Sequence, residues 1–217
     1  VPIEDATEDT GYSYTMVASD IDVGDNLTYA APTLPLWLNF DVATQILSGT
    51  PTNDDVGDHS VVLTISDGFV TVNQEFTITV ANTNDAPVFT STPTTSAIED
   101  AGYSYTAAAS DIDIGDVLSI SGEYPGWLIL IDNGDGTATI SGTPLNEHVG
   151  TNEVVLIVND GTETVNQEFI ITVANTNDPP EFTSIPVDSV LEDSEYSYAI
   201  TVADLDEDDV PTITGEY

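Results

Sequence analysis

Apolar and polar residues alternate along most of this chain. In residues 61–66 every second position is a large apolar residue, and residues 76–80 and 154–158 repeat the pattern. This period of two is typical of half-buried strands, and no segment has the 3.6-residue period of an amphipathic helix. Gly, Pro, Asn and Asp interrupt the pattern after strands of about five to nine residues, a spacing that favours a β-sandwich. The pattern therefore predicts an all-β fold.

Several sequence motifs occur more than once and in the same order. The segment 8–14 resembles 99–105 and 192–198, because each begins with Glu-Asp (or Glu-Asp-Ser) and ends in Tyr-Ser-Tyr. An Asp-x-Asp pair follows each of these segments, and a Ser-Gly-Thr-Pro motif occurs in the first two copies. Such self-similarity indicates tandem repeats. We expect three repeats, at residues 1–83, 84–176 and 177–217, of which the third contains only the first strands.

The pattern of apolar residues in the second repeat predicts seven strands, which would form a Greek-key β-sandwich. The expected strands lie near residues 94–98, 102–109, 117–121, 128–132, 137–142, 152–159 and 163–175. A partial third repeat would expose unpaired strand edges. A neighbouring subunit could complete it in a homopolymer; equally, the 217 residues are an arbitrary cut or the ordered part of a longer chain.

The charge of the chain limits its possible partners more than any single motif does. The chain has 39 Asp and Glu residues, no Lys, no Arg and no Cys, and its formal net charge is −39. Nucleic acid is excluded as a partner, because phosphate binding needs cationic side chains. We expect no membrane insertion, because no apolar run approaches the ~20 residues that span a bilayer. The absence of a basic signal-peptide region indicates an internal piece of a longer protein.

Three acidic segments are candidates for metal binding. The repeated Asn-Thr-Asn-Asp segment ends in proline at 82–87 and 175–180 and follows a strand-like run, so it resembles a short linker. In a Greek-key sandwich, Asp111, Asp113 and Asp160 lie at the end where the linker enters. Oxygen ligands from separate segments suit Ca²⁺, which takes roughly 6–8 oxygens. No Lys or Arg is present to relieve the repulsion within an Asp-x-Asp pair.

These motifs resemble those of a known family. Residues 20–26 resemble the cadherin D-x-D-x-G-x-N motif, and residues 82–87 resemble the cadherin interdomain linker. The segments Trp37–Asp41, Leu47–Pro51 and Ser66–Gly68 are more similar to dystroglycan-type cadherin-like (CADG, or Ig-like) domains of bacterial surface proteins. The resemblance covers essentially the whole chain and implies tandem cadherin/Ig-like sandwiches whose linkers bind calcium.

The resemblance also implies three sets of metal ligands. The first joint would use Asn84, Asp85, Glu99, Asp111, Asp113 and Asp160; the second would use Asn177, Asp178, Glu192, Asp204 and Asp206; and a joint before residue 1 would use Glu8, Asp20, Asp22 and Asp67. The linkers depart from the cadherin motif at Asn82 and Ala86, and at Asn175 and Pro179, which favours one or two ions per joint. Asp54, Asp55 and Glu147 could be ligands or solvated turn residues.

We expect no catalytic residues and no organic cofactor in these repeats. The leading hypothesis is a calcium-rigidified structural or adhesive module of a large extracellular adhesin, matrix protein or filament at the cell surface. Its partners would be neighbouring repeats of the same chain, a homopolymer, or a surface glycan or protein. The alternative is a carbohydrate- or protein-binding accessory module of a secreted multidomain protein. His59 and His148 lie at non-equivalent positions and are expected at the surface.

Overall fold

The computed structural model describes residues 1–22, 24, 26–206 and 209–215. They form two compact units, each described here by itself. Unit 1 comprises Val1–Asp85 together with Ile112–Gly115, and unit 2 comprises Ala86–Asp111 together with Asp116–Tyr217. The short segment 112–115, which belongs by sequence to the second repeat, is therefore part of unit 1.

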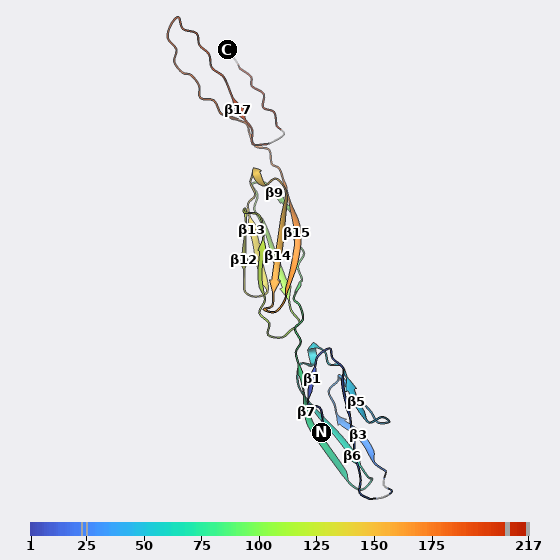
Figure 1. The fold of residues 1–217 in the computed structure, drawn as a ribbon. Coiled ribbons are helices and arrows are strands. Elements are labelled where there is room, and N and C mark those ends of the chain that lie inside the picture. Colours follow the sequence, from blue (N-terminus) through green and yellow to red (C-terminus); the bar gives the residue numbers. More distant parts are fainter. Residues whose placement is uncertain (23, 25, 207–208, 216–217) are drawn as a thin grey trace. The chain divides into compact units, whose positions relative to one another are not determined.

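Unit 1 is a β-sandwich of two sheets (Figure 1). One sheet has the strand order β1-β7-β6-β3 and the other β2-β5-β4. A 3₁₀ turn, η1, precedes β6. The elements are β1 (Asp5–Thr7), β2 (Tyr12–Thr15), β3 (Thr28–Thr33), β4 (Leu38–Asp41), β5 (Ile46–Gly49), η1 (Asn53–Asp55), β6 (Gly57–Ser66) and β7 (Thr71–Ala81).

Unit 2 contains a second sandwich and an additional two-stranded sheet. The sandwich sheets have the orders β12-β13-β10-β8 and β11-β14-β15-β9, and β16 pairs with β17. The elements are β8 (Val88–Phe89), β9 (Ser96–Ile98), β10 (Tyr103–Ser110), β11 (Ser119–Glu123), β12 (Leu128–Asp132), β13 (Thr137–Gly142), η2 (Asn146–His148), β14 (Gly150–Asn159), β15 (Thr164–Ala174), β16 (Glu181–Phe182) and β17 (Val202–Ala203).

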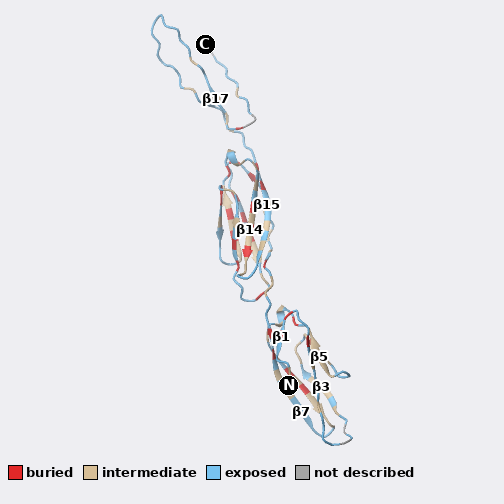
Figure 2. Ribbon diagram, viewed as in Figure 1, coloured by how far each residue is buried: buried red, intermediate tan, exposed pale blue. Residues whose placement is uncertain are grey.

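The alternating apolar residues face the inside of each sandwich. Figure 2 shows the buried positions along the strands of both units. Leu63 in β6 and Leu156 in β14 are both 0% exposed. Each sandwich also has an edge-to-face aromatic pair, Tyr12–Trp37 and Tyr103–Trp127, with ring centroids 5.8 Å apart in both. The all-β prediction is thus confirmed, and the period of two is explained by side chains that alternate between core and solvent.

The glycine of the Ser-Gly-Thr-Pro motif is required by a close backbone approach. A Cβ atom added to Gly49 would lie 1.9 Å from the carbonyl oxygen of Trp37. At Gly142 the distance to the carbonyl oxygen of Trp127 would be 2.0 Å. Contacts this short exclude any side chain, because the obstacle is backbone. The motif therefore holds the tryptophan segment against the end of β5 or β13.

Strand β1 of the first sandwich and the equivalent β9 of the second each pair parallel with the last strand of their sheet. In unit 1, Ala6 of β1 is opposite Val80 of β7, and in unit 2, Ala97 of β9 is opposite Val173 of β15. Parallel pairing makes both strands run toward the same end of the sheet. The residue after β1 or β9 thus lies beside the segment that leaves the last strand. This topology positions the candidate site.

The residues of the third repeat contain little regular structure. Within 178–215, β16 and β17 are the strands among the described residues. Large apolar side chains there are exposed, including Phe182 at 72% and Ile185 at 88%. The described part of the third repeat thus lacks a packed core. The seven strands expected in the second repeat correspond to β9–β15; β8 was not predicted.

Candidate metal centres

Glu8 ends up buried because of the parallel pairing of β1. Its backbone NH donates to the carbonyl oxygen of Ala81 at 3.1 Å, which extends the β1–β7 ladder by one residue. Its side chain lies along the segment that leaves β7, where the backbone NH of Thr83 donates to Oε1. The result is a carboxylate with 1% exposure at the end of unit 1.

Glu99 has the same position in unit 2. Its backbone NH donates to the carbonyl oxygen of Ala174 at 2.9 Å. The backbone NH of Thr176 donates to Oε2 of Glu99 at 3.0 Å. Glu99 is 3% exposed. The first strand and the linker thus hold a buried glutamate in the same way in both units.

The first candidate centre, here called the Glu8 cluster, consists of Glu8, Asp85 and Asp113. Each residue contributes a carboxylate oxygen, and these atoms all lie within 4.8 Å of one another. Asp113 is 5% exposed and its Oδ2 accepts a hydrogen bond from the backbone NH of Asp85 at 2.7 Å. Asn53 of η1 donates from Nδ2 to Oδ2 of Asp85 at 2.6 Å. All these residues belong to unit 1.

The second centre, the Glu99 cluster, consists of Glu99, Asp178 and Asp206. Its carboxylate oxygens also lie within 4.8 Å of one another. Asp206 is 6% exposed, and its Oδ2 accepts from the backbone NH of Asp178 at 2.7 Å. Here the hydrogen bond from an asparagine side chain comes from the linker: Asn175 Nδ2 donates to Asp206 Oδ1 at 2.8 Å.

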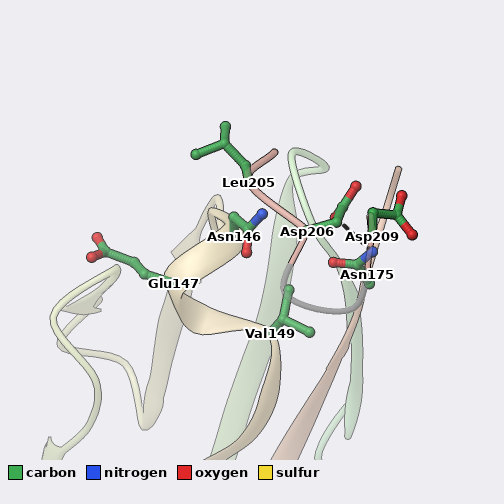
Figure 3. Close-up of a pocket in the computed structure, with 7 residues that line it drawn as sticks. All are labelled: Asn146, Glu147, Val149, Asn175, Leu205, Asp206 and Asp209. Atoms are coloured by element: carbon green, nitrogen blue, oxygen red, sulfur yellow. Dashed lines mark hydrogen bonds between the residues drawn. The ribbon is translucent and has the colours of Figure 1, made fainter. Parts of the chain in front are cut away.

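A cavity of about 610 Å³ adjoins the Glu99 cluster. Figure 3 shows Asn175, Asp206 and Asp209 side by side on one wall, with the hydrogen bond between Asn175 and Asp206 dashed, and Glu147 pointing away from them. Asp206 also belongs to a further acidic group with Asp204 and Asp209, with ligand atoms within 4.8 Å. Asp206 is thus shared by two groups of carboxylates.

A third position in unit 2 brings Asp111, Asp116 and Asp160 together, again within 4.8 Å. Asp160 lies in the turn between β14 and β15. Its Oδ1 accepts from the backbone NH groups of Thr162 and Glu163, both at 2.6 Å. These hydrogen bonds fix the carboxylate of Asp160 in place within the group.

Electrostatics indicate that the buried clusters fit a cation. The sequence contains no Lys or Arg. In the described part of the chain, Oε2 of Glu8 is buried and has no hydrogen-bond partner. A buried carboxylate oxygen without a partner costs about 1–3 kcal/mol or more. A cation with a preference for oxygen removes that cost, and a set made only of carboxylate, amide and backbone oxygens is what Ca²⁺ prefers.

The structure changes how the predicted ligands are grouped. Glu99 was expected with Asp85 and Asp113, but it lies with Asp178 and Asp206. Glu8, assigned to a joint before residue 1, occupies the place with Asp85 and Asp113. The reason is the parallel pairing of the first strand, which puts the glutamate where the chain leaves the sandwich rather than where it enters. The glutamates belong one joint later than expected.

Other predicted ligands are placed as follows. Glu192 is exposed and belongs to none of the acidic groups among the described residues. Asn84 and Asn177 use Nδ2 to donate to the carbonyl oxygens of the following aspartates, at 3.0 and 2.8 Å. Asp20 and Asp22 are exposed; the NH of Asp22 donates to Oδ1 of Asp20 at 2.9 Å.

Asp67 has the same turn geometry as Asp160. Its Oδ1 accepts from the backbone NH groups of Val70 at 2.6 Å and Phe69 at 2.7 Å. The hydrogen bond from Val70, and then that from Phe69, lower the pKa of Asp67 below its ordinary value, because they favour the ionised form. Asp67 belongs to none of the acidic groups among the described residues.

Three residues of these centres were not predicted as ligands from the sequence. Asp116 and Asp209 each follow an Asp-x-Asp pair by a few residues and join an acidic group. Asn53 precedes the pair Asp54 and Asp55, which was left open as a possible ligand segment, and Asn53 itself contacts Asp85. The recurrence of acidic residues after each Asp-x-Asp pair was the signal available for Asp116 and Asp209.

Comparison with known proteins places the chain in a family. The He_PIG family, described as "Putative Ig domain", matches residues 2–81 and 86–174. The chain therefore belongs to this family of Ig-like domains, two of which occur in tandem. Such Ig-like and cadherin-like domains are typical of extracellular proteins. No curated protein matches the chain.

The chain is also similar to several solved structures. Mouse protocadherin-24 EC1-3 is 18% identical, with a TM-score of 0.51 over 95% of this chain and 74% of that chain. Human protocadherin-24 EC1-2 is 20% identical, with a TM-score of 0.49, and the match covers 81% of this chain and 94% of that chain. The likeness to the mouse protein, at a TM-score above 0.5, supports the cadherin-like fold alone.

An endo-fucoidan hydrolase, MfFcnA4 from glycoside hydrolase family 107, is 30% identical over 79% of this chain, with a TM-score of 0.39. The match covers only 27% of the hydrolase chain. The similarity thus concerns a minor part of that enzyme. Separately, among the described residues no helix is long and apolar enough to cross a membrane.

Proposed function

We propose that this chain is a calcium-binding structural region of an extracellular protein, in which the Glu8 and Glu99 clusters hold Ca²⁺ and fix the linkers. The family supports tandem Ig-like repeats. The environment of Glu8 is the main support for a bound metal ion. Its carboxylate is 1% exposed and lies beside two further carboxylates, and one of its oxygens has no hydrogen-bond partner among the described residues.

Within this proposal the ion supplies positive charge and oxygen coordination that no side chain of the protein provides. The chain's own groups would hold the ligands in place. The NH groups of Thr83 and Asp85 orient Glu8 and Asp113, and those of Thr176 and Asp178 orient Glu99 and Asp206. The backbone of each linker is thereby tied to the carboxylates that would bind the ion.

Calcium would therefore convert binding energy into order of the linker. Without it, three carboxylates within 4.8 Å of one another repel, and the linker carries the resulting strain. With it, the linker, the strand end and the Asp-x-Asp loop share one ion, and part of the binding free energy becomes folding free energy. The module would act by stiffness and reach, with no catalytic step of its own, in an adhesin, matrix protein or filament.

The test combines calcium titration with amide exchange. Isothermal titration should show calcium binding, and calcium should slow hydrogen exchange at the four linker amides of Thr83, Asp85, Thr176 and Asp178. At a calcium concentration of 100 times Kd, the free energy of unfolding should rise by about 2.7 kcal/mol.

Single substitutions assign the sites. Glu8→Gln should remove the calcium effect at Thr83 and Asp85 only, and Glu99→Gln the effect at the other linker only. Glu75→Gln is the matched control, because Glu75 is exposed and belongs to none of the acidic groups found among the described residues. Absence of calcium binding, or equal binding by all three variants and the parent chain, would refute the proposal.

A further inference from the structure

Strand β12 lies at the edge of its sheet in unit 2. Among the described residues it pairs with β13 alone, in the order β12-β13-β10-β8. Leu128 and Leu130 pack on the core, whereas Ile129 and Ile131 face outward and are 64% and 59% exposed. An edge strand presents unpaired backbone NH and carbonyl groups. In β12, two large apolar side chains accompany these groups on the protein surface.

The backbone groups that point toward the open edge can be assigned from the hydrogen bonds of the following turn. The NH of Asn133 donates to the carbonyl oxygen of Thr137 at 3.0 Å, directly beyond the end of β12. Hydrogen-bonded positions alternate along an antiparallel pair, so Ile131 and Ile129 also bond to β13, and Leu130 does not. The NH and the carbonyl oxygen of Leu130 therefore point away from β13.

Unit 1 has polar side chains at the equivalent edge. Strands β4 and β12 both begin with a leucine that lies opposite the glycine of the Ser-Gly-Thr-Pro motif, so Asn39 and Asp41 are equivalent to Ile129 and Ile131. Asn39 and Asp41 are both exposed. A charged side chain on an edge strand opposes the pairing of that strand with another chain. The edge of unit 1 is thus protected by a carboxylate, and that of unit 2 is not.

The outer face of the sheet beside β12 is also uncharged. Strands β10 and β13 have serine, threonine or alanine at every outward position, and β12 has isoleucine. The other sheet of unit 2, by contrast, carries the exposed Glu123, Glu153 and Glu168. The whole chain has 39 acidic residues and no Lys or Arg, so most acidic surfaces repel a second copy. A second copy can approach the β12 edge without bringing outward carboxylates together.

The carboxylate at the end of β12 is held by backbone groups. Oδ2 of Asp132 accepts from the backbone NH of Ile120 in β11 at 3.0 Å, and Oδ1 accepts from the NH of Gly134 at 3.0 Å. Strand β11 is the edge strand of the other sheet. The side chain of Asp132 thus occupies a backbone donor of β11, and its carboxylate lies toward that strand rather than on the uncharged face.

We propose that β12 pairs antiparallel with β12 of a second copy of this chain, around a two-fold axis at Leu130. The two leucine residues would exchange NH-to-carbonyl hydrogen bonds across the open edges. Ile129 of each copy would lie opposite Ile131 of the other, and such apolar cross-strand pairs stabilise a sheet. The same strand is used on both copies, so the contact closes on itself and gives a dimer.

The charges favour a second copy as the occupant of this edge. A basic partner would bind the surfaces that carry carboxylates, whereas an uncharged edge fits a strand that is itself uncharged, and β12 is such a strand. In the proposed register Asp132 of each copy lies opposite Leu128 of the other, so the two aspartates are about 14 Å apart along the strands. This distance exceeds the Debye length of about 8 Å at physiological ionic strength, so their repulsion is screened.

The strand pairing does not depend on metal binding. None of the acidic groups among the described residues includes a residue of β12. The dimer should therefore form in a chelator as well as in calcium. Higher salt should strengthen it, because salt screens the repulsion between two chains that each carry a formal charge of −39.

Analytical ultracentrifugation of the 217-residue chain tests the association. The mean mass should rise with protein concentration and stop at twice the mass of one chain. A double variant with Ile129→Asn and Ile131→Asp, which gives β12 the outward residues of β4, should remain a single chain. Ile170→Asp adds the same charge at a residue of β15 that is 50% exposed on the other sheet, and it should still dimerise. Circular dichroism and Trp127 fluorescence report whether each variant remains folded.

Disulfide cross-linking tests the register. The chain has no cysteine, so an introduced cysteine reacts only with that of another copy. Position 129 and position 131 of the second copy would form a non-hydrogen-bonded pair with Cα atoms about 4.5 Å apart, within the range of a disulfide. An equal mixture of Ile129→Cys and Ile131→Cys chains should give mainly mixed dimers, identified by a mass tag on one variant. Either variant alone should cross-link much less, because its cysteines would lie diagonally, roughly 7–8 Å apart.

A chain that stays monomeric at every concentration and salt would overturn the proposal, as would association that survives the double variant. Cross-linking of either cysteine variant alone as efficiently as the mixture would overturn the two-fold register. Dimers that form in a chelator and require the isoleucines support the strand pairing even if calcium fails to bind, so this proposal and the calcium proposal fail separately.

Discussion

The two sandwiches have equivalent strand orders apart from β8. They differ, however, in the contacts and hydrogen bonds of buried side chains. In unit 2, Phe89 packs into the sandwich and Trp127 donates from Nε1 to Asn152 Oδ1 at 3.0 Å. In unit 1, Nε1 of Trp37 is buried without a hydrogen-bond partner among the described residues. We infer that unit 1 is the less stable sandwich.

The tryptophan difference has a simple cause. Position 152 is asparagine, which accepts from Trp127 and donates from Nδ2 to the carbonyl oxygen of His148 at 2.8 Å. The equivalent residue in unit 1 is His59, whose Nε2 contacts the carbonyl oxygen of Asp55 at 2.6 Å. His59 thus keeps the contact to a backbone carbonyl oxygen but accepts no hydrogen bond from the tryptophan indole. A single substitution thus changes the hydrogen bonding of a buried indole.

The acidic clusters differ in which asparagine donates a hydrogen bond to them. In the Glu8 cluster, Asn53 of η1 donates to Asp85. In unit 2, the equivalent Asn146 has a buried Nδ2 without a hydrogen-bond partner among the described residues, and Asn175 donates to Asp206 instead. In unit 1, a residue of the sandwich thus holds the linker residue Asp85. In unit 2, a linker residue holds Asp206 of the Asp-x-Asp pair.

The largest expected effect comes from removing the side chain of Phe89, which packs against the core of the second sandwich. Phe89→Ala should lower the free energy of unfolding of the second sandwich by about 2–3 kcal/mol, below the value for a fully buried phenylalanine because Phe89 is half-buried. Urea unfolding followed by fluorescence separates the units, since the two tryptophans of the chain lie one in each. A loss below about 0.5 kcal/mol would contradict the proposed role of Phe89 in the core.

The next effect concerns the two indole groups. Asn152→His should destabilise the second sandwich by about 1–3 kcal/mol, because it leaves Trp127 Nε1 buried without an acceptor. The reciprocal His59→Asn should stabilise unit 1 by about 1 kcal/mol. Both changes are measured by urea unfolding at neutral pH. Opposite signs in the two units are required; the same sign in both would refute the explanation.

A smaller difference is expected at the asparagines beside the clusters. In the presence of a chelator, Asn53→Ala should destabilise unit 1 by about 1 kcal/mol, since a hydrogen bond to the Asp85 carboxylate is lost. Asn146→Ala should change the stability of unit 2 by less than about 0.5 kcal/mol, because no such bond is broken. Differential scanning calorimetry of the two variants provides the comparison.

The last effect should be equal in both units and appears only at alkaline pH. Burial, and then the nearby Tyr14 or Tyr105, raises the pKa of Tyr12 and Tyr103 from 10.0 to about 12. In the unfolded chain each tyrosine ionises near pH 10, whereas in the folded chain it stays protonated until about pH 12. The free energy of unfolding is therefore unaffected by these groups below pH 10 and falls as the pH rises from about 10 to about 12.

Spectrophotometric titration at the tyrosinate absorbance, with Tyr12→Phe and Tyr103→Phe as controls, should show one late-titrating group lost in each variant. Ordinary titration of both groups near pH 10 would contradict their burial.

The pattern of apolar residues allowed much of this fold to be predicted. The ranges expected for the second repeat correspond to β9–β15, because inward and outward side chains alternate on a strand. Strand β8 was missed because it has two residues, Val88 and Phe89, directly after the linker. So short a run has no period to detect. The histidines were expected at the surface, but each packs against a tryptophan, with ring centroids 5.9 and 6.0 Å apart.

The sequence alone determined which residues are acidic, that no cationic side chain other than histidine is present, and that the motifs recur in a fixed order. It thereby predicted oxygen-rich clusters at the linkers. Only the tertiary structure decided which glutamate belongs to which linker. The parallel pairing of β1 with β7 carries Glu8 to Asp85, and that of β9 with β15 carries Glu99 to Asp178. Strand direction joins residues far apart in the chain, and local sequence does not encode it.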